Sequence, residues 1–412
     1  MQTKEPFTMG TAIIITICVL LLFAYVFDIT AAKTKVPTVI LLLLLGYMVK
    51  QISIFLDIDV PDLSNILPLL GTVGLILIVL EGALELEFNP SKFKLIKQST
   101  LSALLPMIIF CAVVAFIFQY SSNVSFKTAL VNAIPLAVIS SAIAIPSVQN
   151  LAAHNREFVI YESSLSDIFG VLLFNFIALN EQINGASFGK FLMDIVIIII
   201  ISIIATMALS YLLSKIKHPV KYAPIVLMIL LIYSICKIYH LPGLIFILFF
   251  GLFLGNIDEV KNMKLIQRLK PEVLNKEVHK FRELVVEMTF LVRALFFLVF
   301  GSIILTDDLI NTNTILWAIG ICAGIFILRY LTLRLLKIDI LPLTYVAPRG
   351  LITILLFLSI PISDTIAVNN KSLIIQIIII TAIVMMIGIM KNDKIPIPTE
   401  AIKEDDLSNS PT

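Results

Sequence analysis

The sequence predicts an all-α polytopic membrane protein with about 13 transmembrane helices, arranged as two inverted six-helix repeats with crossed broken helices. Composition is the first reason: 59% of the 412 residues are hydrophobic and 14% are charged, against about 25% charged residues in soluble domains. The mean hydropathy is +1.03. Because polar groups could not cover so much apolar surface in water, a soluble enzyme, a disordered regulator and a nucleic-acid binder are excluded.

Apolar segments of helical length are the second reason, because about 20 helical residues cross a bilayer core about 30 Å thick. The first segment is followed by Asp28 and Lys33 instead of a cleavage site, so we interpret it as a retained span. The predicted spans are 8–27, 36–49, 65–86, 99–119, 128–149, 158–179, 188–213, 220–238, 242–255, 284–305, 313–335, 343–361 and 371–390.

The basic residues of the connecting loops are distributed unequally between the two sides of the membrane. Alternate loops hold 21 Lys or Arg on one side and 6 on the other. Cytoplasmic loops carry the excess of basic residues. The N-terminus is therefore predicted outside and the C-terminus in the cytoplasm. The charged connection 256–283 is expected to form an amphipathic helix at the membrane surface.

Ionisable residues within spans are costly and indicate function. Glu162, Asp167, Arg293 and Arg349 lie well inside three predicted spans that start on the same side. Two carboxylates and two guanidiniums at matching depths can neutralise one another. Arg329 lies nearer the end of its span, and we interpret it as a side chain that snorkels to the interface.

Asp167 is the predicted binding group for an ion or a proton. Ser163 and Ser164 lie one turn before it, and Ser166 directly precedes it. A carboxylate with nearby hydroxyl groups suits a small hard cation, which prefers oxygen ligands. The same carboxylate can bind a proton instead, and one group that takes either is the minimum machinery for exchange.

Two spans are interrupted by proline within small or polar stretches, which is the third reason for the predicted fold. The first contains Ser141 and Pro146, and the second contains Pro348 next to Arg349. Proline frees a backbone carbonyl, which is tolerated in a membrane where neighbours or a water-filled cavity satisfy it. Interrupted helices at corresponding positions of two halves indicate a transporter's binding site. We therefore add Ser141 to the ligand group of Asp167, Ser166 and Ser163.

These positions define the predicted organisation of the chain. The first repeat covers residues 1–180 and the second covers 220–390, with a linker span in 181–219 and a short cytoplasmic tail in 391–412. The odd linker span inverts the second repeat relative to the first.

Three stretches resemble the monovalent cation:proton antiporters, specifically the electroneutral prokaryotic sodium/proton exchangers. Residues 161–167, Tyr-Glu-Ser-Ser-Leu-Ser-Asp, resemble their Glu-Ser-x-x-Asn-Asp motif. Residues 346–350, Val-Ala-Pro-Arg-Gly, resemble the arginine-glycine motif of the second broken helix. Residues 289–297, with Gly301 after them, are similar to the family's arginine-bearing helix.

The resemblance implies a homodimer in the bacterial inner membrane, surrounded by lipid, whose core domain moves like an elevator against a dimerisation domain. It implies that Asp167 binds the transported Na⁺ (or K⁺ or Li⁺) and H⁺ and that Glu162 pairs with Arg349. Arg293 would occupy the position where electrogenic relatives carry a lysine. No cofactor is expected, and the protein is expected to have no enzymatic activity.

Two departures from the family pattern matter. Ser166 stands where the family carries asparagine, and the single carboxylate that remains predicts electroneutral exchange. The family usually has Thr-Asp-Pro in the first broken helix, but residues 140–146 contain no acid. The stretch is closer to the Ser-Ser-Thr-Ala sequence of a related branch, which leaves the preference between Na⁺ and K⁺ open.

Two other functions remain as alternatives. Related folds also serve as sodium-coupled symporters of small organic anions, although the isoleucines and alanines of the first broken helix argue against a bulky polar substrate. An ion channel would need a repeated pore loop, and the sequence has none. The four histidines lie in or beside loops, so they form no buried metal cluster.

Overall fold

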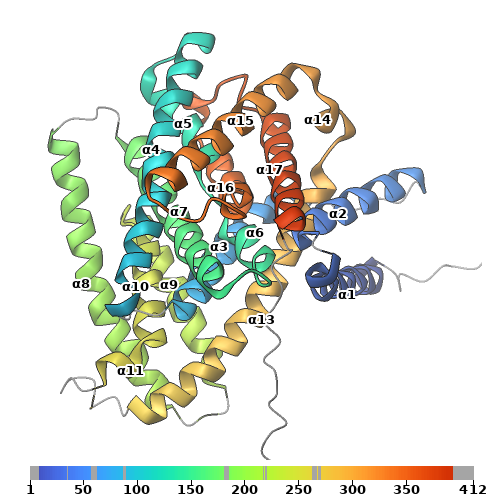
Figure 1. Cartoon of the computed structure of the whole chain (residues 1–412). Helices are drawn as coiled ribbons and strands as arrows, with labels where there is room; N and C mark the ends of the chain where they lie inside the picture. Colours follow the sequence, from blue (N-terminus) through green and yellow to red (C-terminus); the bar gives the residue numbers. More distant parts are fainter. Residues whose placement is uncertain are drawn as a thin grey trace, which may run out of the picture.

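The computed structural model describes residues 9–34, 36–56, 63–86, 90–180, 185–216, 218, 220–261, 267 and 271–392. Within these ranges every regular element is a helix (Figure 1). The longer helices are α1 (Met9–Thr34), α2 (Thr38–Phe55), α3 (Leu67–Glu85), α4 (Phe93–Ser122), α5 (Phe126–Ala137), α7 (Ala153–Leu179), α8 (Gly185–Lys215), α9 (Tyr222–Ile238), α10 (Gly243–Gly255), α13 (Pro271–Ile303), α15 (Thr312–Leu335) and α17 (Lys371–Asn392). The shorter ones are η1 (Ser64–Ile66), η2 (Pro90–Lys92), α6 (Ser141–Ser147), α11 (Ile257–Val260), α14 (Thr306–Ile310), η3 (Leu343–Tyr345), α16 (Leu351–Leu358) and η4 (Ile362–Asp364).

Ten helical segments of the described ranges are long and apolar enough to cross a membrane, so the chain is an integral membrane protein. The predicted count of thirteen is not confirmed by this number. The eighth and ninth predicted spans are α9 and α10, with 17 and 13 residues, and the twelfth is broken between η3 and α16. The division into two repeats stays a prediction, and tail residues 393–412 lie outside the described part of the chain.

The predicted surface helix over residues 256–283 is only partly described. Its first residues form α11, and its last residues, from Pro271 onward, are the start of the long helix α13. Residues 262–266 and 268–270 lie outside the described ranges.

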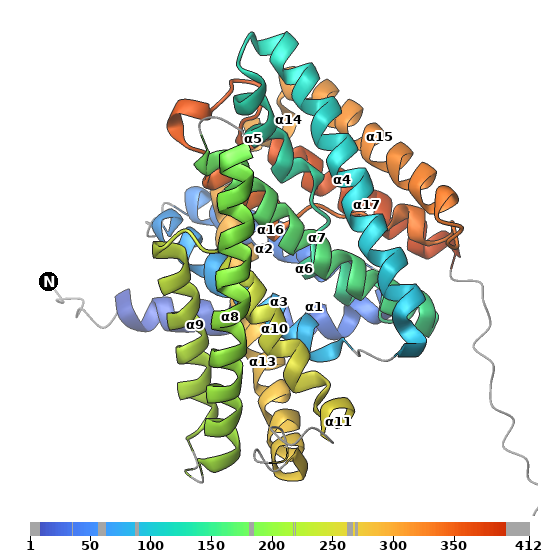
Figure 2. The same cartoon turned by 90° about the vertical axis from the view of Figure 1, so that its left-hand side faces the viewer.

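The helices pack in two groups. We call the first the scaffold group, in which α13 contacts α1, α2, α3 and α8, and α10 contacts α3, α8 and α9. We call the second the core group, in which α4 contacts α5, α7 and α15, α6 contacts α7, α15 contacts α17, and α16 contacts α5 and α7. Figure 2 shows α8, α9, α10 and α13 beside one another, with α4 and α15 on the other side of α7.

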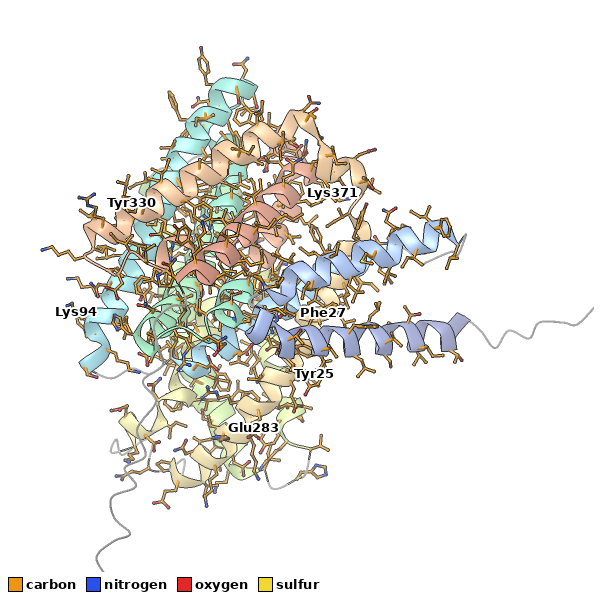
Figure 3. The ribbon with its side chains drawn as sticks, turned by 45° about the vertical axis from the view of Figure 1, so that its right-hand side comes forward. Tyr25, Phe27, Lys94, Glu283, Tyr330 and Lys371 are labelled. Atoms are coloured by element: carbon orange, nitrogen blue, oxygen red, sulfur yellow. The ribbon has the colours of Figure 1, made fainter. Side chains whose placement is uncertain are left out.

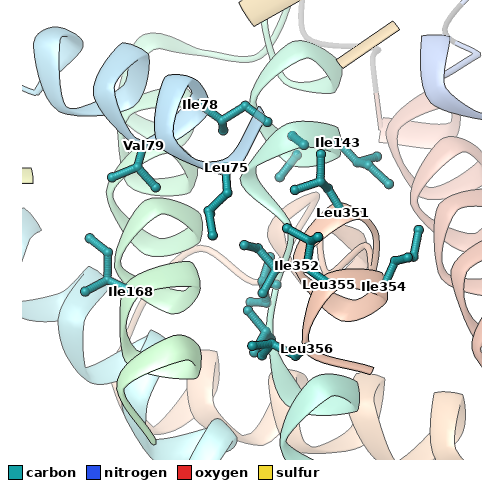
Figure 4. Packing of buried hydrophobic residues seen from close by; sticks show 14 of the residues in the cluster. Leu75, Ile78, Val79, Ile143, Ile168, Leu351, Ile352, Ile354, Leu355 and Leu356 are labelled. Carbon is teal, nitrogen blue, oxygen red and sulfur yellow. The ribbon is translucent and has the colours of Figure 1, made fainter. Parts of the chain in front are cut away.

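The two groups meet along an apolar surface around α3. This helix contacts α7 and α16 of the core group. Leu75, Ile78 and Val79 of α3 are buried there, near Ile168 of α7 and Leu351 of α16 (Figure 4). These apolar contacts around α3 carry no hydrogen bonds that must break when one group slides against the other. A hydrogen bond from Lys371 of α17 to Ile303 of α13 joins the two groups elsewhere.

Close backbone contact joins α2 to α13 within the scaffold group. A Cβ atom on Gly46 would collide with the backbone oxygen of Leu298, and one on Gly301 would collide with the backbone of Leu43. Small residues allow this approach, and dispersion between closely packed backbones is a main source of helix association in lipid. The glycines therefore set the distance between α2 and α13.

We expect Gly46→Ala to destabilise the protein by about 1–3 kcal/mol, because the added methyl group overpacks a backbone contact. Thermal unfolding of the purified protein in detergent measures the effect. Gly320→Ala in α15 is the matched control, since a Cβ atom there meets no atom within 4 Å. Equal unfolding temperatures for the two variants would contradict this account of the α2–α13 contact.

A polar cluster fastens α14 to the start of α17. The ammonium of Lys371 donates to the backbone oxygen of Ile303 at 2.7 Å and lies 3.0 Å from a carboxylate oxygen of Asp308 (Figure 3). Ser372 donates to the same carboxylate at 3.0 Å. Burial acts to raise the pKa of Asp308, but the hydrogen bonds from Lys371, from the Leu305 amide and from Ser372 outweigh it and lower this pKa below its ordinary value.

Asp308→Asn is expected to lower the free energy of unfolding by about 1 kcal/mol at neutral pH. Because the pKa of Asp308 is lower in the folded state, its stabilisation is complete above the unfolded-state value of about 3.9 and disappears as the pH falls through the folded-state value. Thermal unfolding from pH 7 downward should show a constant difference between wild type and variant that shrinks below about pH 4. A difference that persists at the lowest pH would contradict the assignment.

Candidate ion-binding site

The first broken helix is interrupted between α5, which ends at Ala137, and α6, which begins at Ser141. The three residues between them are buried, and two of their backbone amides are satisfied by other segments. The amide of Ile139 donates to the Ser166 hydroxyl at 3.0 Å, and the amide of Ser140 donates to the carbonyl of Pro348 at 2.9 Å. Outside partners therefore hold this stretch out of helical conformation.

The predicted position of this first break is wrong. Pro146 does not lie in the interruption but in the last turn of α6. The physical reason is that a proline near the end of a short helix removes a hydrogen bond without unwinding the residues before it. The extended residues 138–140 are held instead by Ser166 and Pro348.

The second break lies between η3 and α16 and contains Pro348, Arg349 and Gly350. Its amides are also satisfied by side chains: that of Arg349 donates to the Thr381 hydroxyl at 3.1 Å. The bond from Ser140 to Pro348 joins the two breaks directly. A Cβ atom on Gly350 would lie 2.6 Å from the side chain of Ile143, so the two broken helices cross in contact.

The side chain of Arg349 binds backbone oxygens at this crossing. Its Nε donates to the carbonyl of Leu136 at 2.7 Å and its Nη1 to that of Ala347 at 2.9 Å. Leu136 is in the last turn of α5, where carbonyl groups have no partner in the helix and carry partial negative charge. The guanidinium therefore compensates the partial negative charge of the α5 C-terminus inside the protein.

The predicted pair of Glu162 with Arg349 is not formed, and Arg329 takes the place of Arg349. Two guanidinium nitrogens of Arg329 each lie 2.8 Å from a separate carboxylate oxygen of Glu162. Both side chains are buried, at 3% and 1% exposure. Arg329 also donates to the carbonyl of Leu343 at 2.6 Å, and Ser102 donates to Glu162. The planar guanidinium fits a carboxylate with two parallel bonds, whereas Arg349 is occupied by carbonyls.

The interpretation of Arg329 as a snorkelling side chain is therefore also wrong. Its face of α15 is the buried face, with Ala318, Cys322 and Ile325 at helical spacing before it. The side chain consequently points into the core group instead of toward the membrane interface. The ion pair fastens α15 to α7.

Asp167 is buried at 1% exposure, and only one of its two carboxylate oxygens accepts hydrogen bonds from the described residues. Its Oδ2 accepts hydrogen bonds from the hydroxyl of Ser141 and, at 3.3 Å, from the amide of Ser141. Its Oδ1 has no hydrogen-bond partner in the described part of the chain, and no described lysine or arginine forms an ion pair with it. A buried polar atom without a partner requires an explanation, and a role in binding a cation or a proton would provide one.

The serines around Asp167 have different roles. The Ser163 hydroxyl donates to the backbone oxygen of Val159 at 2.7 Å, one turn back in its own helix. The Ser166 hydroxyl accepts from Ile139 and so supports the first break. Of the predicted ligand group, the structure brings Ser141 into direct contact with Asp167. The Ser164 hydroxyl, which is not in the predicted ligand group, has no partner among the described residues.

A cavity of about 640 Å³ reaches this site, and its lining includes residues 149–151 of the loop after α6. It lies between α1, α3, α6 and α13, and Ser141 forms part of its wall. Its charged lining residues are four carboxylates and one guanidinium, namely Asp28, Glu81, Glu85, Glu287 and Arg293. The acidic excess attracts cations and raises their local concentration.

The predicted intramembrane charge Arg293 lies in this cavity wall and forms no ion pair or hydrogen bond with the described residues. Glu81, which lines the cavity one turn before Glu85, was not part of the predicted site. A sequence signal was present, because Glu81 lies a full turn deeper in its span than Glu85. Its exposure to the cavity depends on how α3 packs against α13, which the sequence does not show.

Broken helices that cross inside a polytopic helical membrane protein, beside a partly unsatisfied carboxylate and a cavity open to one end, are the construction of a secondary active transporter. The particular family follows from comparison with known proteins. The family described as sodium/hydrogen exchanger, transmembrane, matches residues 17–390, so the chain belongs to it.

Solved structures of the sodium proton antiporter MjNhaP1 from Methanocaldococcus jannaschii are similar to the whole chain. The structure at pH 8 has a TM-score of 0.65 at 19% identity and covers 92% of this chain and 95% of its own. A second, determined by electron microscopy, has a TM-score of 0.64 at 20% identity and covers 94% and 96%. The predicted antiporter fold is thereby confirmed. A comparison with curated protein sequences gives no match.

Proposed function

We propose that this protein exchanges a monovalent cation, Na⁺ first and Li⁺ or K⁺ as alternatives, for H⁺ by alternating access. Membership of the sodium/hydrogen exchanger family supports this class of reaction. The observation that carries the proposal is the buried carboxylate of Asp167, which has one oxygen held by Ser141 and one without a partner. A cavity with an acidic lining reaches Ser141, so a cation from water can approach the carboxylate.

We propose that the exchange is electroneutral. Glu162 is fully engaged with Arg329, so Asp167 is the carboxylate at the crossing that is left to bind a substrate. One carboxylate binds either one monovalent cation or one proton, and the core group then has the same charge in both loaded states. A cycle that carries equal charge in opposite directions moves no net charge.

The transport step that we propose is a movement of the core group against the scaffold group. The apolar surface between α3 and the helices α7 and α16 supports it, because apolar contacts can re-form after sliding. With the orientation predicted from the loop charges, the 640 Å³ cavity opens to the cytoplasm, so this conformation faces inward. A homodimer held by the scaffold group in a bacterial inner membrane remains part of the proposal by family resemblance.

The lining of the cavity disfavours the alternative of a symporter for a small organic anion. Arg293 could pair with an anion, but four carboxylates surround the same space. Like charges raise the cost of bringing an anion into a confined, partly desolvated site. The cavity therefore selects for cations.

Exchange in proteoliposomes tests the proposed function. Vesicles that contain a fluorescent pH indicator are given a pH gradient across the membrane. Na⁺, Li⁺ or K⁺ is then added outside. We expect Na⁺ to dissipate the gradient, at a rate that does not change when the membrane potential is clamped at different values with K⁺ and valinomycin. Absence of a cation-dependent proton flux would overturn the exchange, and a rate that follows the potential would overturn electroneutrality.

A further inference from the structure

Two buried oxygens on α7 lack partners, and they lie one turn apart. They are Oδ1 of Asp167 and Oγ of Ser164, on residues exposed by 1% and 2%. Residues three positions apart are neighbours on one side of a helix, with Cβ atoms about 5–6 Å apart. In the described part of the chain, the other buried oxygens without partners belong to Ser140, Thr206, Ser210 and Asn369.

The Ser164 hydroxyl lies against Gly82 of α3, and Gly82 lines the 640 Å³ cavity. A Cβ atom on Gly82 of α3 would lie 2.8 Å from this hydroxyl and 3.9 Å from the side chain of Ile145. Gly82 and Ile145 both line the cavity. The glycine thus leaves room for the Ser164 hydroxyl beside the cavity lining.

We infer that the Ser164 hydroxyl is a ligand of the transported cation and determines the selectivity of the site together with Oδ1 of Asp167. This inference rests on the proposed cation/proton exchange at Asp167. Ser141 already holds the other carboxylate oxygen, and the two free oxygens lie one turn apart on one helix, where both can bind the same hard cation, which prefers oxygen ligands. A proton needs only the carboxylate.

The difference between the two substrates gives the inference a specific consequence. Removing the Ser164 hydroxyl weakens binding of the cation and leaves binding of the proton unchanged. The apparent KM for the cation should rise while the maximal rate is retained, since the moving groups and the carboxylate are intact. A smaller ion needs a closer set of oxygens, so the apparent KM should rise more for Li⁺ and Na⁺ than for K⁺.

The adjacent Ser163 provides the competing assignment. It is equally buried, but its hydroxyl hydrogen is bonded to the carbonyl of Val159. It also lies on the same α7 turn before Asp167, so sequence position alone does not separate the two serines. The structure assigns the ligand role to Ser164 because its oxygen has no partner among the described residues and lies against Gly82, which lines the cavity.

The test compares Ser164→Ala with Ser163→Ala in the proteoliposome exchange assay. We expect Ser164→Ala to raise the KM for Na⁺ and Li⁺ about tenfold, which corresponds to the loss of one oxygen contact to a charged group. The maximal rate should stay within about twofold. At a Na⁺ concentration well above KM, the acid limb of the rate–pH profile should move up by about one pH unit, because the proton then competes against a tenfold weaker cation. An effect of Ser163→Ala equal to or larger than that of Ser164→Ala overturns the inference.

Two further variants keep the result decisive. Gly82→Ala retains Ser164 but fills the space beside its hydroxyl, so this variant should also raise the KM for Na⁺. An unchanged KM in a folded Gly82→Ala protein counts against the inference. Ser202→Ala is the control for loss of a buried serine, since this hydroxyl on α8 bonds the carbonyl of Ile198 away from the site. If the wild type exchanges Na⁺ and Ser164→Ala has the wild-type KM, the inference fails and the proposed function stands. If the wild type exchanges no cation, the proposed function fails with it.

Discussion

Replacing Asp167 with asparagine is expected to abolish cation/proton exchange. The amide has nearly the same shape as the carboxylate and can still accept a hydrogen bond from Ser141, so the crossing of the broken helices should remain intact. It carries no charge for a cation and takes up no proton near neutral pH. Because the variant lacks the one group proposed to bind both substrates, pH-gradient-driven Na⁺ uptake in proteoliposomes should fall to the rate of empty vesicles.

The matched control for this variant is Asp194→Asn. Asp194 is a half-buried carboxylate on α8 that lines a separate cavity of about 150 Å³ with Lys190 and His240. The Asp194→Asn protein should keep most of the wild-type exchange rate. Thermal unfolding of both variants shows whether they are folded, and full exchange by a folded Asp167→Asn protein would refute the assignment of the site.

The second large effect is expected for Arg329→Met, and it concerns stability. The substitution leaves Glu162 buried, with Ser102 as its remaining side-chain partner. Breaking a buried ion pair by removing one partner costs about 3–5 kcal/mol, because the other charge stays uncompensated. We therefore expect a large drop in the thermal unfolding temperature in detergent and a low yield of folded protein.

Arg334→Met is the control for this substitution, because Arg334 lies in the last turn of the same helix and is exposed. A Glu162→Gln, Arg329→Met double variant should be more stable than Arg329→Met alone, since no buried charge is left without a partner. If Arg329→Met were as stable as Arg334→Met, the Arg329 side chain would lie at the membrane interface and not in the core group.

The fold class was predictable from the sequence because each membrane span has its own local signal. An apolar stretch of helical length marks the span, and the basic residues of the flanking loops predict its orientation. The location of the first break was not predictable in this way. Pro146 is a strong local signal, but residues 138–140 are extended because Ser166 and Pro348 supply their hydrogen-bond partners. Partners that are distant in the chain leave no local pattern.

The ion pair could have been predicted better from helical periodicity. Distance from the end of the span suggested snorkelling for Arg329. Its spacing from Ala318, Cys322 and Ile325 places it instead on a face of small and apolar residues, which is the face that packs. Which of two arginines Glu162 binds depends on how α15 and α16 approach α7, and this is a property of the assembled fold.

The sequence could not show which of two adjacent serines is free to bind a ligand. Ser163 and Ser164 are chemically identical and adjacent. Their hydroxyls differ because one meets the carbonyl of Val159 and the other meets the space beside Gly82. Only the packing of α3 against α7 separates them.

The hydrogen bond from Ser140 to Pro348 also has a consequence for biosynthesis. Ser140 enters the membrane while the ribosome has yet to synthesise Pro348. Until then the Ser140 amide lacks its final acceptor, and an unsatisfied backbone group in lipid costs several kcal/mol. The nascent first half must therefore keep its break hydrated or paired in another way. The crossing, and with it the Asp167 site, is completed only when the last part of the chain has been inserted, so newly made chains gain transport competence late in their assembly.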